Sequence, residues 1–140
     1  MIVVDTSVWS LAFRRREQRA HLPSVVSFLH QLIESDEPIG IPGIVLQELL
    51  GGVRDDAQAR RLEGLMAGFA LLLADREQHL LAAQISTSCR RAGAAAATVD
   101  CLIAAQCITT HSALLTVDDD FGRISRHCDL RLLPLPASSQ

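Results

Sequence analysis

The 140-residue chain contains no lysine and no tyrosine, and all 13 of its basic residues are arginine. The lack of lysine excludes several classes of protein whose chemistry depends on that side chain. These are P-loop ATPases, Schiff-base enzymes, receiver domains and phosphatases of the haloacid dehalogenase type. With one Trp and four Phe, an extended aromatic surface for stacking nucleic-acid bases is not expected either.

Cysteine and histidine occur without the spacings of a metal or nucleophile motif. The four cysteines form no C-x-x-C pair, and the five histidines show no H-E-x-x-H or similar arrangement. A zinc site is therefore not expected, and the cysteines are interpreted as small buried residues in a reducing cytosol. No G-x-S-x-G sequence or Cys–His motif indicates a nucleophile.

Long hydrophobic runs and a strong net charge are also missing. The longest apolar run, residues 64–74, is too short to span a bilayer, and the N-terminus lacks the basic start of a signal peptide. We therefore expect a soluble, cytoplasmic protein. The net charge of −3 gives no general attraction to polyanions, so a polyanion would need a local basic patch or a metal ion.

Short apolar segments alternate with longer amphipathic segments along the chain. The expected strands are residues 2–4, 39–41, 69–73, 113–116 and 130–133, the last one at a sheet edge because prolines follow it. The expected helices are residues 7–13, 23–35, 43–53, 55–67, 75–91 and 99–111, with Thr98 as the N-cap of the last, and a short helix opened by residues 118–120. This alternation predicts an α/β domain with a mostly parallel sheet. We expect one domain over residues 1–135 and a frayed tail over 136–140.

Four carboxylates stand where an expected strand ends or an expected helix begins: Asp5, Glu48, Asp100 and Asp118. Taken singly, a helix cap, a helix surface or a solvated turn explains three of them. Asp100 is harder to explain, because the segment around it is apolar nearly all round. Burying its charge costs several kcal/mol without a partner or metal, and the helix dipole offsets only about 0.3–1 kcal/mol.

Together, these carboxylates indicate a metal site. Sites in open parallel sheets form beyond the carboxyl ends of the strands, where all four residues would gather. Four carboxylates in one pocket repel one another unless a hard cation such as Mg²⁺ or Mn²⁺ joins them. Such an ion can polarise a phosphate and lower the pKa of a bound water. The pattern therefore predicts a divalent-metal phosphodiesterase.

At these residues the chain resembles the PIN-domain ribonucleases, especially the VapC-type toxins of toxin–antitoxin pairs. The resemblance covers most of the chain and rests on residues 4–9, Glu48, residues 100–105 and residues 115–121. It implies a three-layer α/β/α sandwich, with residues 1–135 as a single PIN-like nuclease domain. It also implies RNA cleavage that depends on Mg²⁺, with Mn²⁺ able to substitute. The implied partners are an RNA substrate, a second copy of the chain in a homodimer and a small VapB-type antitoxin.

The same resemblance implies roles for individual residues. Asp5 and Asp100 would be the most direct metal ligands, and Glu48 and Asp118 would complete the catalytic and metal-binding site, partly through waters. Thr6 or Thr116 would position a ligand or phosphate through its hydroxyl. Because three aspartates occur in a row, the fourth acid is ambiguous; Asp118 comes first after the strand, and Asp120 is the family's second acidic position.

Arginines close in sequence to the acids are the candidates for RNA backbone contacts. Their guanidinium groups suit bidentate phosphate recognition. The candidates are Arg14, Arg15, Arg16 and Arg19 after the first helix, Arg90 and Arg91 before Asp100, and Arg123 and Arg126 after Asp118.

Two alternatives to an RNA-cleaving toxin remain open at this point. One is a PIN-family nuclease that acts in RNA maturation or on DNA. The other is a non-catalytic PIN-like module that binds a protein, although the presence of all four acids argues against it. The RNA target, the antitoxin and the number of metal ions do not follow from the sequence.

Overall fold

The computed structural model describes residues 1–14 and 23–137. Five strands form one sheet in the order β3-β2-β1-β4-β5, and every neighbouring pair is parallel. The strands are β1 (Ile2–Val4), β2 (Ile39–Pro42), β3 (Ala70–Leu72), β4 (Ala113–Leu115) and β5 (Arg131–Leu132). The parallel α/β sheet expected from the sequence is confirmed, and β5 lies at the edge where its flanking prolines place it.

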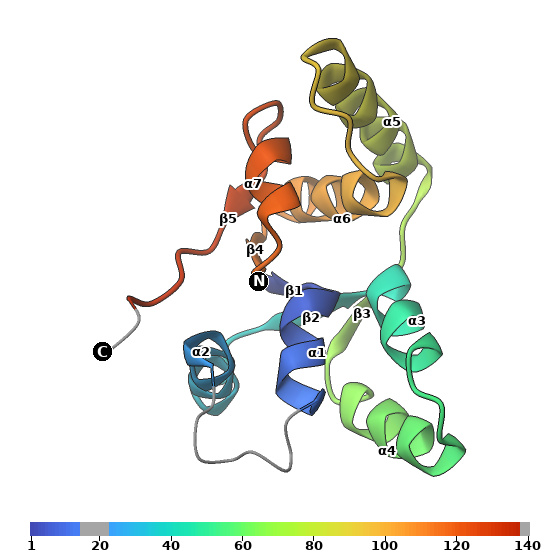
Figure 1. Ribbon diagram of the computed structural model, residues 1–140, viewed down its shortest axis with the longest axis vertical. Coiled ribbons are helices and arrows are strands. Elements are labelled where there is room, and N and C mark those ends of the chain that lie inside the picture. The colour runs from blue at the N-terminus through green and yellow to red at the C-terminus, as the bar shows by residue number, and fades with distance from the viewer. Residues whose placement is uncertain (15–22, 138–140) are drawn as a thin grey trace.

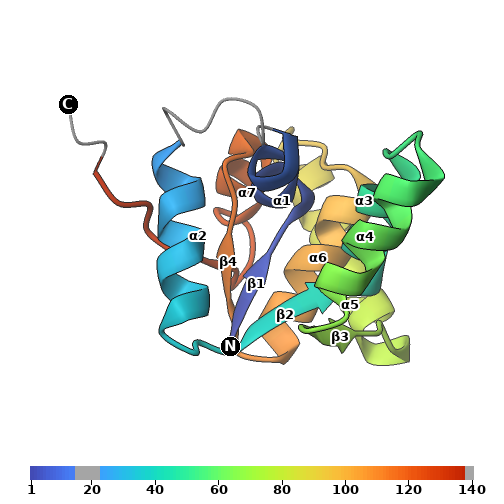
Figure 2. The same cartoon turned by 90° about the horizontal axis from the view of Figure 1, so that it is seen from below.

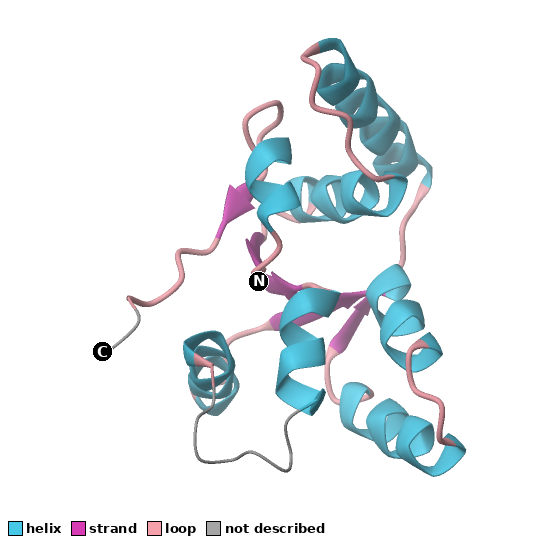
Figure 3. Ribbon diagram, viewed as in Figure 1, coloured by secondary structure: helices cyan, strands magenta, loops and turns pink. Residues whose placement is uncertain are grey.

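Helices cover both faces of this sheet (Figures 1 and 3). One layer contains α1 (Thr6–Arg14), α2 (Ser24–Glu34), α3 (Gly43–Gly51) and α4 (Asp56–Met66). The opposite layer contains α6 (Thr98–Thr109) and α7 (Asp119–Ile124), with α5 (Arg76–Arg91) packed along α6. The architecture is therefore the expected three-layer α/β/α sandwich. No helix in these described ranges is both long and apolar enough to cross a membrane.

The central strands and α6 form the middle of the core. Val3 and Val4 of β1 and Leu114 and Leu115 of β4 are completely buried. Consecutive apolar residues without polar alternation are what a strand covered on both faces requires. Helix α6 buries six of its residues, among them Cys101 and Cys107, which explains why its sequence is apolar nearly all round.

One expected helix start differs from the structure. We expected Thr98 to cap α6, but Thr98 is already helical, and Ala97 occupies the N-cap position without a side-chain hydrogen bond. By contrast, Asp75 forms a complete capping box with Gln78 at the start of α5. The helix therefore begins one residue early, which makes Asp100 its third residue.

The order of the strands creates a crevice at the carboxyl ends of β1 and β4. These two strands are neighbours, but the chain leaves β1 towards β2 and leaves β4 towards β5, in opposite directions along the sheet. The helices that follow β1 and β4 consequently lie on opposite faces, as Figure 1 shows for α1 and α7. Figure 2 views the sheet from the side of α1 and α2. A crevice of this kind is the usual ligand site of an open parallel sheet. Asp5 follows β1 here, and Thr116 and Asp118 follow β4.

Candidate metal centre

Asp5 is a buried carboxylate that two hydroxyl groups satisfy. Its side chain is 4% exposed. Oδ1 accepts a hydrogen bond from Ser7 Oγ at 2.7 Å, and Oδ2 accepts one from Thr116 Oγ1 at 2.8 Å. Burial raises the pKa of Asp5, the bonds from Ser7, Thr116 and the Val8 backbone lower it, and the charge of Asp118 raises it, with a net upward shift. The hydroxyl groups therefore offset part of the cost of burying this charge.

The same two hydroxyls fasten the loop after β4 to the end of β1. Thr116 Oγ1 accepts from the Asp118 backbone N–H at 3.0 Å, and Ser7 Oγ accepts from the Val117 N–H at 3.2 Å. A positioning role was predicted from the sequence for Thr116 but not for Ser7. The hint was available, because a serine two residues beyond an aspartate can bond back to its carboxylate.

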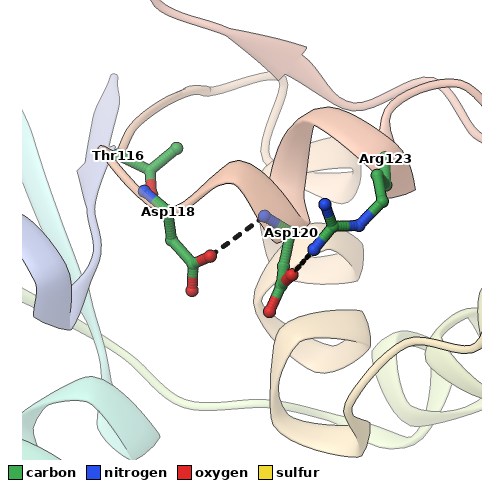
Figure 4. A network of polar contacts seen from close by, with 4 residues as sticks. All are labelled: Thr116, Asp118, Asp120 and Arg123. Atoms are coloured by element: carbon green, nitrogen blue, oxygen red, sulfur yellow. Dashed lines mark hydrogen bonds and ion pairs between the residues drawn. The ribbon is translucent and has the colours of Figure 1, made fainter.

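Asp100, Asp118 and Asp120 converge at the crevice. One carboxylate oxygen from each of them lies within 4.8 Å of those of the other two. Figure 4 shows how Asp118 and Asp120 are held: Asp118 caps α7 by accepting from the Asp120 N–H at 2.9 Å, and the Arg123 guanidinium pairs with the Asp120 carboxylate. Of the three consecutive aspartates, the structure thus brings the first and the third to Asp100, and Asp119 is not part of the group.

The four acids singled out in the sequence are close enough to influence one another. The pKa of Asp100 is raised from 3.8 to about 6, first by burial and then by the charges of Asp118, Asp5 and Glu48. A carboxylate that protonates near neutral pH is the expected result of such crowding. Three carboxylate oxygens facing one another form a hard, oxygen-only donor set, so the residues present fit a divalent cation of the Mg²⁺ or Mn²⁺ type.

Glu48 lies at the exposed rim of the site on α3. Its Oε1 accepts a hydrogen bond from Thr6 Oγ1, in the first turn of α1, at 3.1 Å. Thr6, expected to hold a ligand or phosphate, therefore holds a carboxylate here. Neither Glu48 nor Asp5 belongs to the tight Asp100–Asp118–Asp120 group.

Of the arginines predicted to contact RNA, Arg123 is placed at the site by its pair with Asp120. Arg90 and Arg91 are exposed in the last turn of α5, and Arg123 and Arg126 are exposed near α7. Arg15, Arg16 and Arg19 lie outside the described residues, as does the side chain of Arg14.

A carboxylate-lined crevice at the switch point of a three-layer parallel sheet matches the architecture of PIN domains. The PIN domain family model matches residues 2–127, and the chain belongs to this family. Over 133 residues it is 33% identical to "VapC ribonuclease Mb1587" of Mycobacterium bovis and to "Ribonuclease VapC11" of Mycobacterium tuberculosis. These alignments cover 94% of this chain and 96% of each relative.

Solved structures with the same fold include complexes of toxins with antitoxins. VapBC2 from Rickettsia felis, bound to a DNA fragment from its promoter, superposes with a TM-score of 0.75 at 19% identity, covering 95% of this chain and 98% of that one. FitAcB from Neisseria gonorrhoeae has a TM-score of 0.72 at 23% identity, covering 96% and 97% of the two chains. At these identities the likeness shows the fold.

Proposed function

We propose that this protein is a metal-dependent endoribonuclease and acts as the toxin of a toxin–antitoxin pair. The observation that carries the proposal is the meeting of Asp100, Asp118 and Asp120 beside the buried Asp5 in one crevice. The ribonuclease names of relatives aligned over nearly their whole length support RNA as the substrate.

We assign the metal contacts to Asp5, Asp100 and Asp118, with Asp120 as a neighbouring acid. When bound, Mg²⁺ or Mn²⁺ would polarise the scissile phosphate and lower the pKa of a water at the site. The hydroxyls of Ser7 and Thr116 fix the orientation of the Asp5 carboxylate, and the Asp120 N–H fixes that of Asp118. Such outer contacts keep ligands in place before the cation arrives.

Glu48 is assigned to the attacking water. It is exposed at the rim, and the Thr6 hydroxyl holds one of its oxygens. The other oxygen can accept a hydrogen bond from a water that approaches the phosphate, and a carboxylate in this position can take up its proton. The exposed Arg90, Arg91 and Arg126 lie near enough in sequence to the acids to hold the RNA backbone on either side.

A small VapB-type antitoxin is the proposed protein partner, and a homodimer the proposed assembly. The VapBC structures from Rickettsia felis and Haemophilus influenzae, which share this fold, support the antitoxin. We also propose a cytoplasmic location, because cellular RNA, the proposed substrate, is found there.

The test is cleavage of single-stranded RNA by wild type and by Asp100→Asn, with Mg²⁺, with Mn²⁺ and with EDTA. We expect the variant to lose activity by about 100-fold or more, because it removes a ligand charge while keeping the shape of the side chain. Glu37→Gln is the matched control: Glu37 is exposed and precedes β2, at the opposite end of the strands from the site. Full activity in Asp100→Asn, or in EDTA, would reject the proposal.

Two further measurements separate the alternatives. A DNA strand of the same sequence, cleaved as fast as the RNA, would favour a nuclease acting on DNA. Calorimetric titration with Mn²⁺ tests the non-catalytic module, which should bind the ion weakly and equally in wild type and in Asp100→Asn.

A further inference from the structure

A pocket of about 680 Å³ opens between α1, α3 and α4. Its volume lies within the range of about 300–1,000 Å³ typical of small-molecule sites. It continues along the same two helices that carry the Thr6–Glu48 hydrogen bond. Ser10, four residues after Thr6, and Gly52, four residues after Glu48, both line it. The pocket therefore begins one helical turn beyond the rim of the proposed catalytic site.

The lining combines positive charge with apolar surface. Arg54 and Arg61 line the pocket together with the amide of Gln58, and none of the described residues that line it is acidic. Within residues 1–14 and 23–137, Arg123 forms an ion pair with Asp120. Neither Arg54 nor Arg61 forms an ion pair with a carboxylate in these ranges. Exposed guanidinium groups without a carboxylate partner remain available for phosphate oxygens.

The apolar side of the pocket includes an aromatic ring with a rigid backing. Phe13 lines the pocket and stacks on Trp9, with ring centroids 5.9 Å apart and planes 13° from parallel. Trp9 is 2% exposed, and its Nε1 donates to the carbonyl of Val4 in β1 at 3.2 Å. Leu49, Val53, Leu62 and Leu65 add to the apolar lining. Few aromatic residues argue against an extended stacking surface, but a single fixed ring is enough to receive one base.

We propose that this pocket binds one nucleotide of the RNA substrate next to the scissile bond, an inference that rests on the proposed ribonuclease function. The base packs against Phe13 and the leucines, Gln58 contacts its polar edge, and Arg54 and Arg61 hold the flanking phosphates. Single-stranded RNA offers this combination of flat apolar faces, hydrogen-bonding edges and anionic oxygens. The pocket begins one helical turn beyond the Thr6–Glu48 pair of the proposed cleavage site, so one RNA strand can occupy both, which favours RNA over an acidic peptide.

The test compares two substrates in the full-length protein. One is a single-stranded RNA oligonucleotide; the other is bis(p-nitrophenyl) phosphate, a phosphodiester too small to span both the crevice and the pocket. In the double variant Arg54→Gln/Arg61→Gln we expect KM for the RNA to rise about tenfold or more, while hydrolysis of the small ester stays at the wild-type rate. Each lost phosphate contact should also reduce the slope of log affinity against log salt concentration by about 0.7.

Two more variants separate the stacking contact from simple electrostatics. Phe13→Leu keeps the apolar packing and should raise KM for the RNA several-fold with an unchanged salt slope. Arg60→Gln removes an exposed charge from the same helix outside the pocket lining, and should behave as wild type.

Several results would overturn the proposal. One is an unchanged KM for the RNA in the double variant. Another is an equal loss on both substrates, which would place the effect in the acidic site. A third is an unchanged KM accompanied by lost inhibition by the antitoxin, which would make the pocket a protein-binding surface. If the wild type cleaves neither substrate, the proposed function itself fails and this inference falls with it.

Discussion

The acidic crevice should destabilise the metal-free protein at neutral pH, and Asp100 offers a way to measure this. Its pKa is about 6 in the folded protein, against a reference value of 3.8, because burial and the charges of Asp118, Asp5 and Glu48 disfavour its ionised form. The folded state therefore binds more protons than the unfolded state between these two values. The free energy of unfolding consequently falls as the pH rises from about 4 to 6, and the loss persists above pH 6.

The shift sets the size of the expected effect. About two pKa units correspond to at most about 3 kcal/mol. Asp100 is only partly buried, and solvent screening reduces this figure to about 1–2 kcal/mol. Asp100→Asn removes the ionisation, so the metal-free variant should be more stable than wild type by about 1–2 kcal/mol at pH 8. At pH 4, where Asp100 is largely protonated in the folded protein, the two should be nearly equal.

Urea denaturation followed by Trp9 fluorescence provides the assay, since Trp9 is the single tryptophan and is buried. Wild type, Asp100→Asn and the control Glu37→Gln are compared in EDTA at pH 4 and pH 8, and again with Mn²⁺ at pH 8. Mn²⁺ at 100 times its Kd should stabilise wild type by about 2.7 kcal/mol, and Asp100→Asn by much less. Equal stability of wild type and Asp100→Asn at pH 8 would refute the electrostatic reasoning, as would an equal gain from Mn²⁺.

Three more substitutions test the contacts around the crevice. Thr116→Val should weaken Mn²⁺ binding by about 10–100-fold in calorimetry because Asp5 loses an orienting hydroxyl. Thr116→Ser keeps a hydroxyl and should bind Mn²⁺ nearly as well as wild type. Equal Mn²⁺ affinities of Thr116→Val and wild type would show that the hydroxyl is irrelevant. Thr6→Val should lower kcat for RNA cleavage several-fold with little change in KM, since the Glu48 carboxylate loses its fixed orientation; a change in KM alone would contradict this. Arg123→Gln should raise Mn²⁺ affinity by no more than about fivefold, because the pair is exposed and worth about 0–1 kcal/mol; a large loss of affinity would mean that Arg123 supports the site.

The fold could be predicted from the sequence because its main determinant, the hydrophobic pattern of short segments, is local. Continuous apolar runs such as residues 2–4 and 113–115 can be stable only in strands covered on both faces. Helices of the predicted lengths between them supply the covering layers. The strand-end positions of Asp5 and Asp118 then bring these residues together, because the carboxyl ends of parallel strands share one edge of the sheet.

The features that escaped prediction depend on which strands are neighbours. The Ser7 contact with Val117 joins residues 110 positions apart, and it exists only because β1 pairs with β4. Alternation of strands and helices does not reveal that order. The pocket with Arg54 and Arg61 likewise requires α1, α3 and α4 to meet, whereas the arginines predicted to contact RNA are those close in sequence to the acids. The choice among the three consecutive aspartates needed the geometry of the α7 cap.

Asp5 and Asp100 differ in the hydrogen bonds that their carboxylates accept. Asp5 is the more deeply buried, but each of its oxygens receives a hydroxyl hydrogen bond, and these bonds offset part of the cost of burying its charge. Asp100 accepts no hydrogen bond from any described residue and faces Asp118 and Asp120. The need for a positive charge is therefore greater at Asp100 than at Asp5. Substitution of Asp100 should accordingly relieve repulsion in the metal-free protein, whereas substitution of Asp5 should leave the hydroxyls of Ser7 and Thr116 without an acceptor and lower stability even in EDTA.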